Sequence, residues 1–327
     1  MLLQIIFIIV GVALVIWGAD RLTEGAASLA RGMRVPEIII GLTIVAAGTS
    51  APELFVSLVA AFNGTADLAV GNVIGSNIFN TALIVGCAAL VAPMAVAKST
   101  VKKDIPFAVV ASLLLFMLCF DDMDSPHLWG NEISRSDGFI LLAGFTAFMI
   151  YTFRAAKKDG LMPTEEELED NRELPKDYSK LWRNLSLMAL GLACLIVGSN
   201  LFVDGASYAA YRFGLRQSVV GLTIVAGGTS LPELATSVVA AYKGRSAIAI
   251  GNVIGSNVYN ILLILGVTAV VHPLRIMGIS IMDLMMMLVS VGLLWLFAFT
   301  KYSVSRREGL VLVGGFIAYM AWLLWLL

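Results

Sequence analysis

The sequence predicts an all-α integral membrane protein in which ten transmembrane helices form two inverted five-helix repeats, with helices interrupted at mid-membrane. Three observations predict this fold class. The 327 residues are 59% hydrophobic and only 14% charged, whereas a soluble domain carries roughly 25% charged residues. Apolar stretches of about 20 residues, the length that spans a bilayer, recur along the whole chain. The two halves of the chain also repeat the same motifs at one constant spacing.

Ten apolar segments are candidate spans. The chain begins MLLQIIFIIV and has no basic start, so we interpret its first segment as a spanning helix rather than a signal peptide. The expected spans are 2–30, 36–62, 67–92, 104–120 and 137–154 in the first half, and 184–212, 217–242, 247–271, 279–299 and 308–326 in the second.

One long polar stretch, residues 154–180, separates the two halves. Thr164 followed by Glu167 predicts one short capped helix within it. The expected organisation is an N-terminal repeat at 1–155, a linker loop at 156–182 and a C-terminal repeat at 183–327.

Two motifs occur once in each half. GLTIVAAGTSAPEL at 41–54 returns as GLTIVAGGTSLPEL at 221–234, and GNVIGSN at 71–77 returns at 251–257. Asn80 and Asn260 keep the same displacement of 180 residues. The repeated motif regions therefore extend over 41–80 and 221–260. Long blocks that share one displacement indicate an internal repeat.

An odd number of spans in each half has a geometric consequence. The second copy must enter the membrane from the opposite side, as in the inverted repeats of secondary transporters. Basic residues test the orientation, because Lys and Arg gather in cytoplasmic loops. With the N-terminus outside, seventeen of the 22 Lys and Arg residues fall in inner loops, and only Arg135, Arg212, Arg216 and Arg275 fall in outer ones. Both termini are therefore expected outside, and the loop 154–180 in the cytoplasm.

A proline interrupts each copy of the first motif. Pro52 and Pro232 have no N–H group, and each ring clashes with the carbonyl four residues earlier, that of Gly48 or Gly228. Interrupted backbone at membrane depth is tolerated where it lines a cavity or finds partners. We therefore expect oxygen ligands there: the freed backbone carbonyls, including those of Ala46, Thr49, Ala226 and Thr229, and the hydroxyl groups of Thr49, Ser50, Thr229 and Ser230.

The same motif also fits a helix start. Ser50 with Glu53, and Ser230 with Glu233, match the S-x-x-E pattern of a capping box. We expect this capping to accompany the interruption, since a helix that restarts within the membrane is discontinuous.

Glu53 and Glu233 are the most costly residues in these segments. A charge near the bilayer centre costs about 2.5–3.5 kcal/mol on insertion scales. Neither expected span holds a Lys or Arg near the glutamate. A divalent cation would balance the two carboxylates, so we predict that they bind one.

The second motif is expected to complete the site. Ser76 and Asn80 lie four residues apart and share a helix face, and Ser256 and Asn260 do likewise, so both pairs offer neutral oxygens to the glutamates. Asn77 and Asn257 point off that face and are expected to make interhelical hydrogen bonds. Glycines four apart, at 71 and 75 and at 251 and 255, predict close helix approach.

The predicted ligands are all oxygens, which favours Ca²⁺ over Mg²⁺ and disfavours zinc or copper. The three cysteines lie in apolar stretches and form no disulfide framework. Residues 121–132 have the length of an EF-hand loop, but Met123 and Pro126 occupy positions that such a loop gives to a ligand and a glycine.

The paired GTSxPEL and GNxxGSNxxN blocks resemble the alpha repeats of the calcium/cation antiporter superfamily, which includes the sodium/calcium exchangers, and the layout resembles its prokaryotic members. The resemblance implies a location in the plasma (inner) membrane and an ion-binding bundle of the second, third, seventh and eighth spans, past which the first and sixth slide. It implies Ca²⁺ ligation by Glu53, Glu233 and the carbonyls of Thr49 and Thr229. For Na⁺ it implies the same glutamates with Ser50, Ser230, Ser76, Ser256 and the carbonyls of Ala46 and Ala226.

This sequence departs from the resemblance at one position. Some exchangers with this layout carry an aspartate where Asn260 stands, whereas Asn80 and Asn260 are both amides here. The site therefore holds two formal negative charges, which leaves the coupling ion and the stoichiometry open.

The expected function is exchange of Ca²⁺ for Na⁺ by alternating access, without a cofactor. An exchanger of Ca²⁺ for protons is the alternative, because protons also neutralise carboxylates in a dry pocket. A membrane metalloprotease is disfavoured because no HExxH motif occurs, and a glutamate-lined channel would differ by a much higher flux. The expected partners are small cations and the lipid bilayer, not nucleic acid; the sequence does not determine an oligomeric state.

Overall fold

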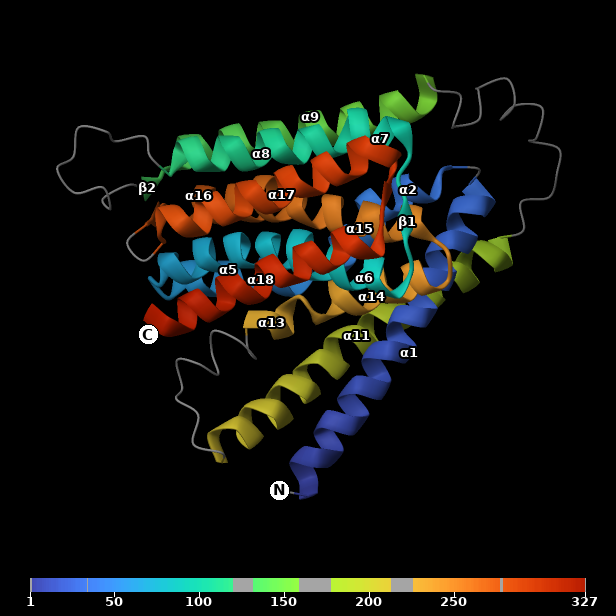
Figure 1. Cartoon of the computed structure of the whole chain (residues 1–327), viewed down its shortest axis with the longest axis horizontal. Helices are drawn as coiled ribbons and strands as arrows, with labels where there is room; N and C mark the ends of the chain where they lie inside the picture. Colours follow the sequence, from blue (N-terminus) through green and yellow to red (C-terminus); the bar gives the residue numbers. More distant parts are fainter. Residues whose placement is uncertain are drawn as a thin grey trace.

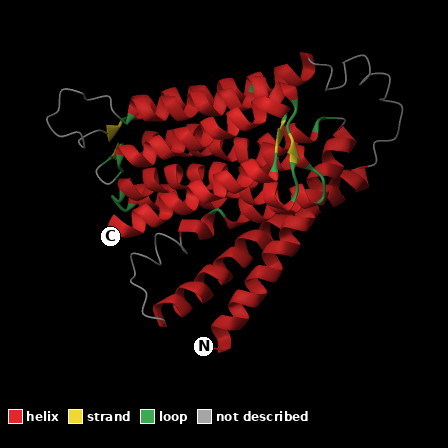
Figure 2. Cartoon of the chain, in the orientation of Figure 1, coloured by secondary structure: helices red, strands yellow, loops and turns green. Residues whose placement is uncertain are grey.

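The fold is that of a computed structural model, which describes residues 2–33, 35–119, 132–158, 178–212, 226–276 and 279–326. Three sequence-based predictions lie wholly or mostly outside these residues: the EF-hand comparison at 121–132, the short helix near Thr164, and the start of the span expected at 217–242. Helices dominate the described residues (Figure 2).

The helices follow the apolar segments closely. In the first half they are α1 (Leu2–Met33), α2 (Glu37–Ile40), α3 (Ala46–Thr49), α4 (Ala51–Phe62), α5 (Ala66–Ile78), α6 (Val85–Val91), α7 (Lys98–Lys102), α8 (Asp104–Leu118) and α9 (Arg135–Lys158). In the second half they are α11 (Tyr178–Arg212), α13 (Ala226–Thr229), α14 (Leu231–Tyr242), α15 (Ser246–Val258), α16 (Leu265–Val271), α17 (Ile281–Lys301) and α18 (Arg306–Leu326).

Seven helices among the described residues are long and apolar enough to cross a membrane, or eight if the bent segment from Glu37 to Phe62 counts as one span. The protein is therefore a helical, multi-pass membrane protein. Two of the ten expected spans are not among these eight. Helix α8 has only 15 residues, and the span expected at 217–242 begins outside the described residues and is divided at Ser230.

Three stretches that lie within the repeated motif regions or overlap their ends are π-helical, which the sequence did not predict. They are η1 (Gly41–Val45), η2 (Phe79–Ile84) and η5 (Tyr259–Ile264). The second and third begin 180 residues apart, one residue before Asn80 and Asn260. Single π-helical turns inside helices occur frequently at functional sites because they shift which side chains face inward.

Helices α5 and α15 lie at the centre of the bundle. The candidate spans that contain them, Leu68–Val91 and Ser246–Val271, are 72% and 83% buried, whereas the other spans are only 11% to 33% buried. Most residues of the second motif are therefore buried inside the protein.

Helices α1 and α11 lie side by side and extend away from the rest of the bundle (Figure 1). Glycines spaced seven residues apart form their contact, and we call this row the glycine seam: Gly11, Gly18 and Gly25 of α1 with Gly191, Gly198 and Gly205 of α11. A Cβ atom at Gly11 would lie 2.7 Å from the carbonyl oxygen of Gly198, and one at Gly18 would lie 2.6 Å from that of Gly191. The order of these contacts makes the two helices antiparallel.

Close approach at the second motif is confirmed in one half only. A Cβ atom at Gly255 would lie 2.6 Å from Cβ of Ala46, and one at Gly251 would lie 2.8 Å from the carbonyl oxygen of Ile38. At Gly75, no described atom lies within 4 Å. Residues 221–225, the repeat counterpart of 41–45, lie outside the described part of the chain, so the equivalent contact in the other half is not described.

Two short antiparallel strand pairs join the halves. Strand β1 (Met94–Ala95) pairs with β4 (Ser303–Val304), and β2 (Glu132–Ile133) pairs with β3 (Leu274–Arg275). Each pair combines one strand from each half, and Figure 1 shows β1 and β2 at opposite ends of the bundle.

Candidate cation-binding site

Both copies of the first motif interrupt a helix at the serine two residues before the proline. Helix α3 ends at Thr49, and α4 begins at Ala51 after a bend of 44°. In the second half α13 ends at Thr229 and α14 begins at Leu231. Pro52 and Pro232 occupy the first turn of the new helix, where the missing N–H has no intrahelical partner to lose.

The predicted release of the Gly48 carbonyl is wrong. The carbonyls of Ala46 and Gly48 both accept backbone N–H groups where α3 ends, including that of Ser50 on Ala46 at 3.0 Å. A tight turn at a helix end often satisfies carbonyls in this way. Each carbonyl oxygen still has a second lone pair, so it retains the capacity to bind a cation.

The predicted capping boxes are also wrong. Neither serine hydroxyl caps its own helix. Ser50 Oγ donates instead to Glu233 Oε1 at 3.1 Å, and Ser230 Oγ donates to Glu53 Oε1 at 3.0 Å. A hydrogen bond from the serine hydroxyl to an ionised carboxylate is about twice as strong as a hydrogen bond between that hydroxyl and a neutral backbone N–H. The serine therefore bonds to the glutamate of the other half.

These two reciprocal bonds bring the glutamates of the two halves together. Glu53 and Glu233 are 0% and 1% exposed. Neither forms an ion pair with a Lys or Arg of the described residues. Two carboxylates therefore share a buried region without a basic counter-charge.

Five buried oxygens of the predicted ligands have no hydrogen-bond partner among the described residues. They are Oε2 of Glu53 and of Glu233, Oδ1 of Asn80 and of Asn260, and Oγ of Ser256. Buried polar atoms nearly always have partners in native proteins. Unpartnered acceptors of this kind fit a cation, and their hard oxygen chemistry fits Ca²⁺ or Na⁺.

The remaining predicted ligands lie around these oxygens. Ser76 Oγ is 3.2 Å from Ser230 Oγ. The Thr49 hydroxyl donates to Asn252 Oδ1 at 3.1 Å. Thr229 is half-buried at the end of α13. Ala226 begins α13, and its side chain lies outside the described structure.

Sequence reasoning missed the asparagine that follows the first glycine of each second motif. Asn252 Nδ2 donates to the Glu233 carbonyl at 3.4 Å and to Ser237 Oγ at 3.0 Å. Asn72 Nδ2 makes the equivalent bonds to the Glu53 carbonyl, at 3.3 Å, and to Ser57 Oγ, at 3.1 Å. Each asparagine therefore links its own helix, α5 or α15, to the neighbouring helix that carries a glutamate, α4 or α14. Its presence in both motif copies was the available signal.

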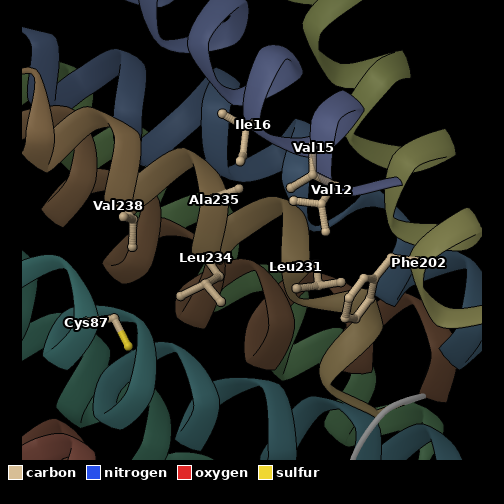
Figure 3. A pocket seen from close by; sticks show the side chains of 9 residues that line it. All are labelled: Val12, Val15, Ile16, Cys87, Phe202, Leu231, Leu234, Ala235 and Val238. Atoms are coloured by element: carbon tan, nitrogen blue, oxygen red, sulfur yellow. The ribbon is translucent and has the colours of Figure 1, made fainter. Parts of the chain in front are cut away.

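A cavity of about 360 Å³ lies between α1, α6, α11 and α14 (Figure 3). Its walls are apolar and include Val12, Phe202 and Leu234, and neither glutamate lines it. It offers no ligand for a cation, so it is separate from the candidate site. Among the described residues, no group of three or more His, Cys, Asp or Glu side chains could hold a metal.

Comparison with known proteins identifies the family. Residues 3–154 and 184–325 match the sodium/calcium exchanger protein family. The chain belongs to this family. The sodium/calcium exchanger MaX1 of Methanosarcina acetivorans is 30% identical, with 96% of this chain and 97% of MaX1 covered. The inner membrane protein YrbG of Escherichia coli K12 is 37% identical, with 100% of this chain and 98% of YrbG covered.

A solved structure is also similar over nearly the whole length. The sodium–calcium exchanger NCX_Mj, soaked with 10 mM Na⁺ and no Ca²⁺, has a TM-score of 0.81 at 30% identity, with 98% of each chain covered. The resemblance to prokaryotic sodium/calcium exchangers is thus confirmed. The family consists of ion exchangers that transport cations across a membrane, not of enzymes.

Replacing Ser50 with alanine tests the bond between the halves. The change removes the Ser50 donor from the buried Glu233 Oε1, so we expect ion-free protein to lose about 1–3 kcal/mol of stability, measured by thermal unfolding in detergent. Ser199→Ala is the matched control, because the buried Ser199 hydroxyl has no partner among the described residues. Equal unfolding temperatures for the two variants would contradict a stabilising role for the Ser50–Glu233 bond.

Proposed function

We propose that this protein is a secondary active antiporter that exchanges Ca²⁺ for Na⁺ by alternating access, with Glu53 and Glu233 shared by the competing cations. The observation that carries the proposal is the pair of buried carboxylates, joined across the two halves and without a basic partner among the described residues. Membership of the sodium/calcium exchanger family supports it.

The proposed ligands follow from the unpartnered oxygens and the resemblance. Ca²⁺ is held by Glu53 and Glu233 with the carbonyls of Thr49 and Thr229. Na⁺ uses the same glutamates with Ser50, Ser230, Ser76, Ser256 and the carbonyls of Ala46 and Ala226. Asn80 and Asn260 add neutral amide oxygens, and Pro52 and Pro232 set the helix interruptions.

The proposed architecture is ten transmembrane helices in two inverted repeats, at 1–155 and 183–327, joined by the loop 156–182. Inverted repeats run in opposite directions through the membrane, and the antiparallel contact of α1 with α11, its counterpart, supports this. The pairing of β-strands from the two halves supports it as well.

In the proposed orientation both termini lie outside the plasma (inner) membrane and the loop 154–180 lies in the cytoplasm, which the distribution of basic residues supports. Labelling single cysteines at residue 2 and residue 165 from each side of the membrane checks this orientation. Labelling of residue 165 from outside would contradict it.

The exchange mechanism follows from charge. An ion-free site with two bare carboxylates resists closure into a dry, occluded state, because charges in a low-dielectric interior are costly. One Ca²⁺, several Na⁺ or two protons cancel the charge and remove that cost. Only the loaded protein then changes its open side, so one cation crosses in exchange for another.

Ca²⁺ uptake into vesicles that contain the purified protein tests the coupling ion. An outward Na⁺ gradient is expected to drive Ca²⁺ uptake, and a proton gradient of the same size is expected to drive little. Uptake driven by protons and not by Na⁺ would favour the Ca²⁺/H⁺ exchanger, whose protons would neutralise the same two glutamates.

A further inference from the structure

Four buried asparagines form a hydrogen-bonded network across the two halves. Asn80 Nδ2 donates to Asn257 Oδ1 at 3.0 Å, and Asn260 Nδ2 donates to Asn77 Oδ1 at 3.1 Å. All four side chains are at most 3% exposed. The expectation that Asn77 and Asn257 make interhelical hydrogen bonds is therefore confirmed.

The network leaves only one end of each ligand amide free. Asn80 and Asn260 each use the NH₂ end of the amide for a bond to the other half, while both Oδ1 atoms have no partner among the described residues. An amide carries a donor at one end and an acceptor at the other. Binding the donor end therefore presents the acceptor end, which is the end that a cation requires.

We propose that Asn77 and Asn257 are positioning residues that set cation affinity by orienting the amides of Asn260 and Asn80, respectively, with the oxygen toward the site. The proposal rests on the proposed function, since it assumes that these amide oxygens bind the transported cation. Without an acceptor at Asn77, the Asn260 amide can turn its NH₂ group toward a carboxylate oxygen. That arrangement is self-satisfied and repels a cation.

The side chain of Asn77 is itself bonded to the other repeat. Its Nδ2 donates to the backbone carbonyl of Asn257 at 3.4 Å, and the backbone carbonyl of Asn77 accepts the Thr81 hydroxyl at 2.7 Å. Thr81 Oγ1 lies 2.6 Å from Ser290 Oγ of α17. The side-chain amide whose oxygen accepts from Asn260 is thus tied to the second repeat through its NH₂ group, so its removal is a sharp test.

A double-mutant cycle on the full-length protein in vesicles tests the proposal, with Ca²⁺ as the probe. Interacting residues give non-additive effects, whereas independent residues give additive ones. We expect Asn77→Ala and Asn260→Ala each to weaken Ca²⁺ binding about tenfold, and the double variant also about tenfold, since the effects act through one amide. The maximal uptake rate of Asn77→Ala is expected to change far less than its Ca²⁺ affinity.

The unbonded pair is the matched control. Asn77 and Asn80 act through different amides, so the variant with alanine at both positions is expected to lose about a hundredfold in affinity. A hundredfold loss for the bonded pair Asn77 and Asn260 would overturn the positioning role. Unchanged Ca²⁺ affinity in Asn260→Ala and in Asn80→Ala would instead overturn the proposed site itself, so the two failures are distinguishable.

A second variant distinguishes a specific loss of Ca²⁺ affinity from poor folding of Asn77→Ala. Asn77→Ser keeps a hydroxyl in the core but is too short to reach the Asn260 amide, so it is expected to show the same tenfold loss. Wild-type affinity in a folded Asn77→Ser protein would contradict the proposal.

Discussion

Glu53→Gln and Glu233→Gln are each expected to reduce Ca²⁺ uptake to below about 1% of the wild-type rate. With one carboxylate neutral, the site can no longer cancel both charges of Ca²⁺. An uncompensated buried charge costs about 3–5 kcal/mol, and every 1.4 kcal/mol corresponds to about a tenfold change. The measurement is uptake into vesicles with equal amounts of folded protein.

The same substitutions should change stability in the opposite direction. Ion-free wild-type protein holds two buried carboxylates, each with one oxygen that has no partner among the described residues. Removing one charge removes repulsion, so we expect the ion-free glutamine variants to unfold at a higher temperature than the ion-free wild type. We also expect Ca²⁺ to stabilise the wild type and not the variants. These results would separate loss of function from misfolding.

Glu24→Gln is the matched control for both measurements, since Glu24 is partly exposed and pairs with Arg21 at 3.2 Å. It is expected to leave uptake near the wild-type rate. Saturable Ca²⁺ uptake by either buried-glutamate variant would rule out the proposed role of that residue.

Gly198→Val is expected to disrupt the pairing of α1 with α11. A Cβ atom at Gly198 would lie 2.8 Å from the Gly11 carbonyl oxygen and 2.9 Å from the backbone nitrogen of Val15. Backbone atoms cannot rotate away as a side chain can, so the helices must separate. We expect a loss of about 3 kcal/mol, the upper end of the usual range for overpacked cores, measured as a lower unfolding temperature and a smaller fraction of monodisperse protein.

Gly314→Val provides the control, because no described atom lies within 4 Å of a Cβ atom at Gly314 of α18. It adds the same side chain to another membrane helix. If both variants unfolded at the same temperature, the close contact in the glycine seam would not explain the effect.

Much of the candidate site could be predicted because its signals are local. A glutamate, a proline and hydroxyls in an apolar membrane segment cost free energy unless they find polar partners. The same residue types recur 180 residues further along the chain. The motifs therefore identified Glu53, Glu233 and the serines that contact them. They also predicted the helix interruptions at Ser50 and Ser230, which the structure contains.

Other features could not be predicted, because they depend on neighbours in space. Ser50 and Glu53 match a capping box in sequence, but the acceptor that Ser50 uses is Glu233, 183 residues away. The seven-residue spacing of the glycines in α1 and α11 is visible in the sequence, but not which helix faces them. The π-helical turns were missed because their residues do not differ from those of ordinary membrane helices.

The sequence by itself determined the membrane class, the duplicated motifs and the two unbalanced acidic side chains, since hydropathy and charge belong to each segment wherever it packs. Only the tertiary structure decided which polar atoms satisfy one another and which remain without a partner in the described residues. The physical reason is that a hydrogen bond requires two groups within about 3 Å. The tertiary structure thus determines how the amides of Asn80 and Asn260 are oriented, whereas their positions in the sequence alone do not.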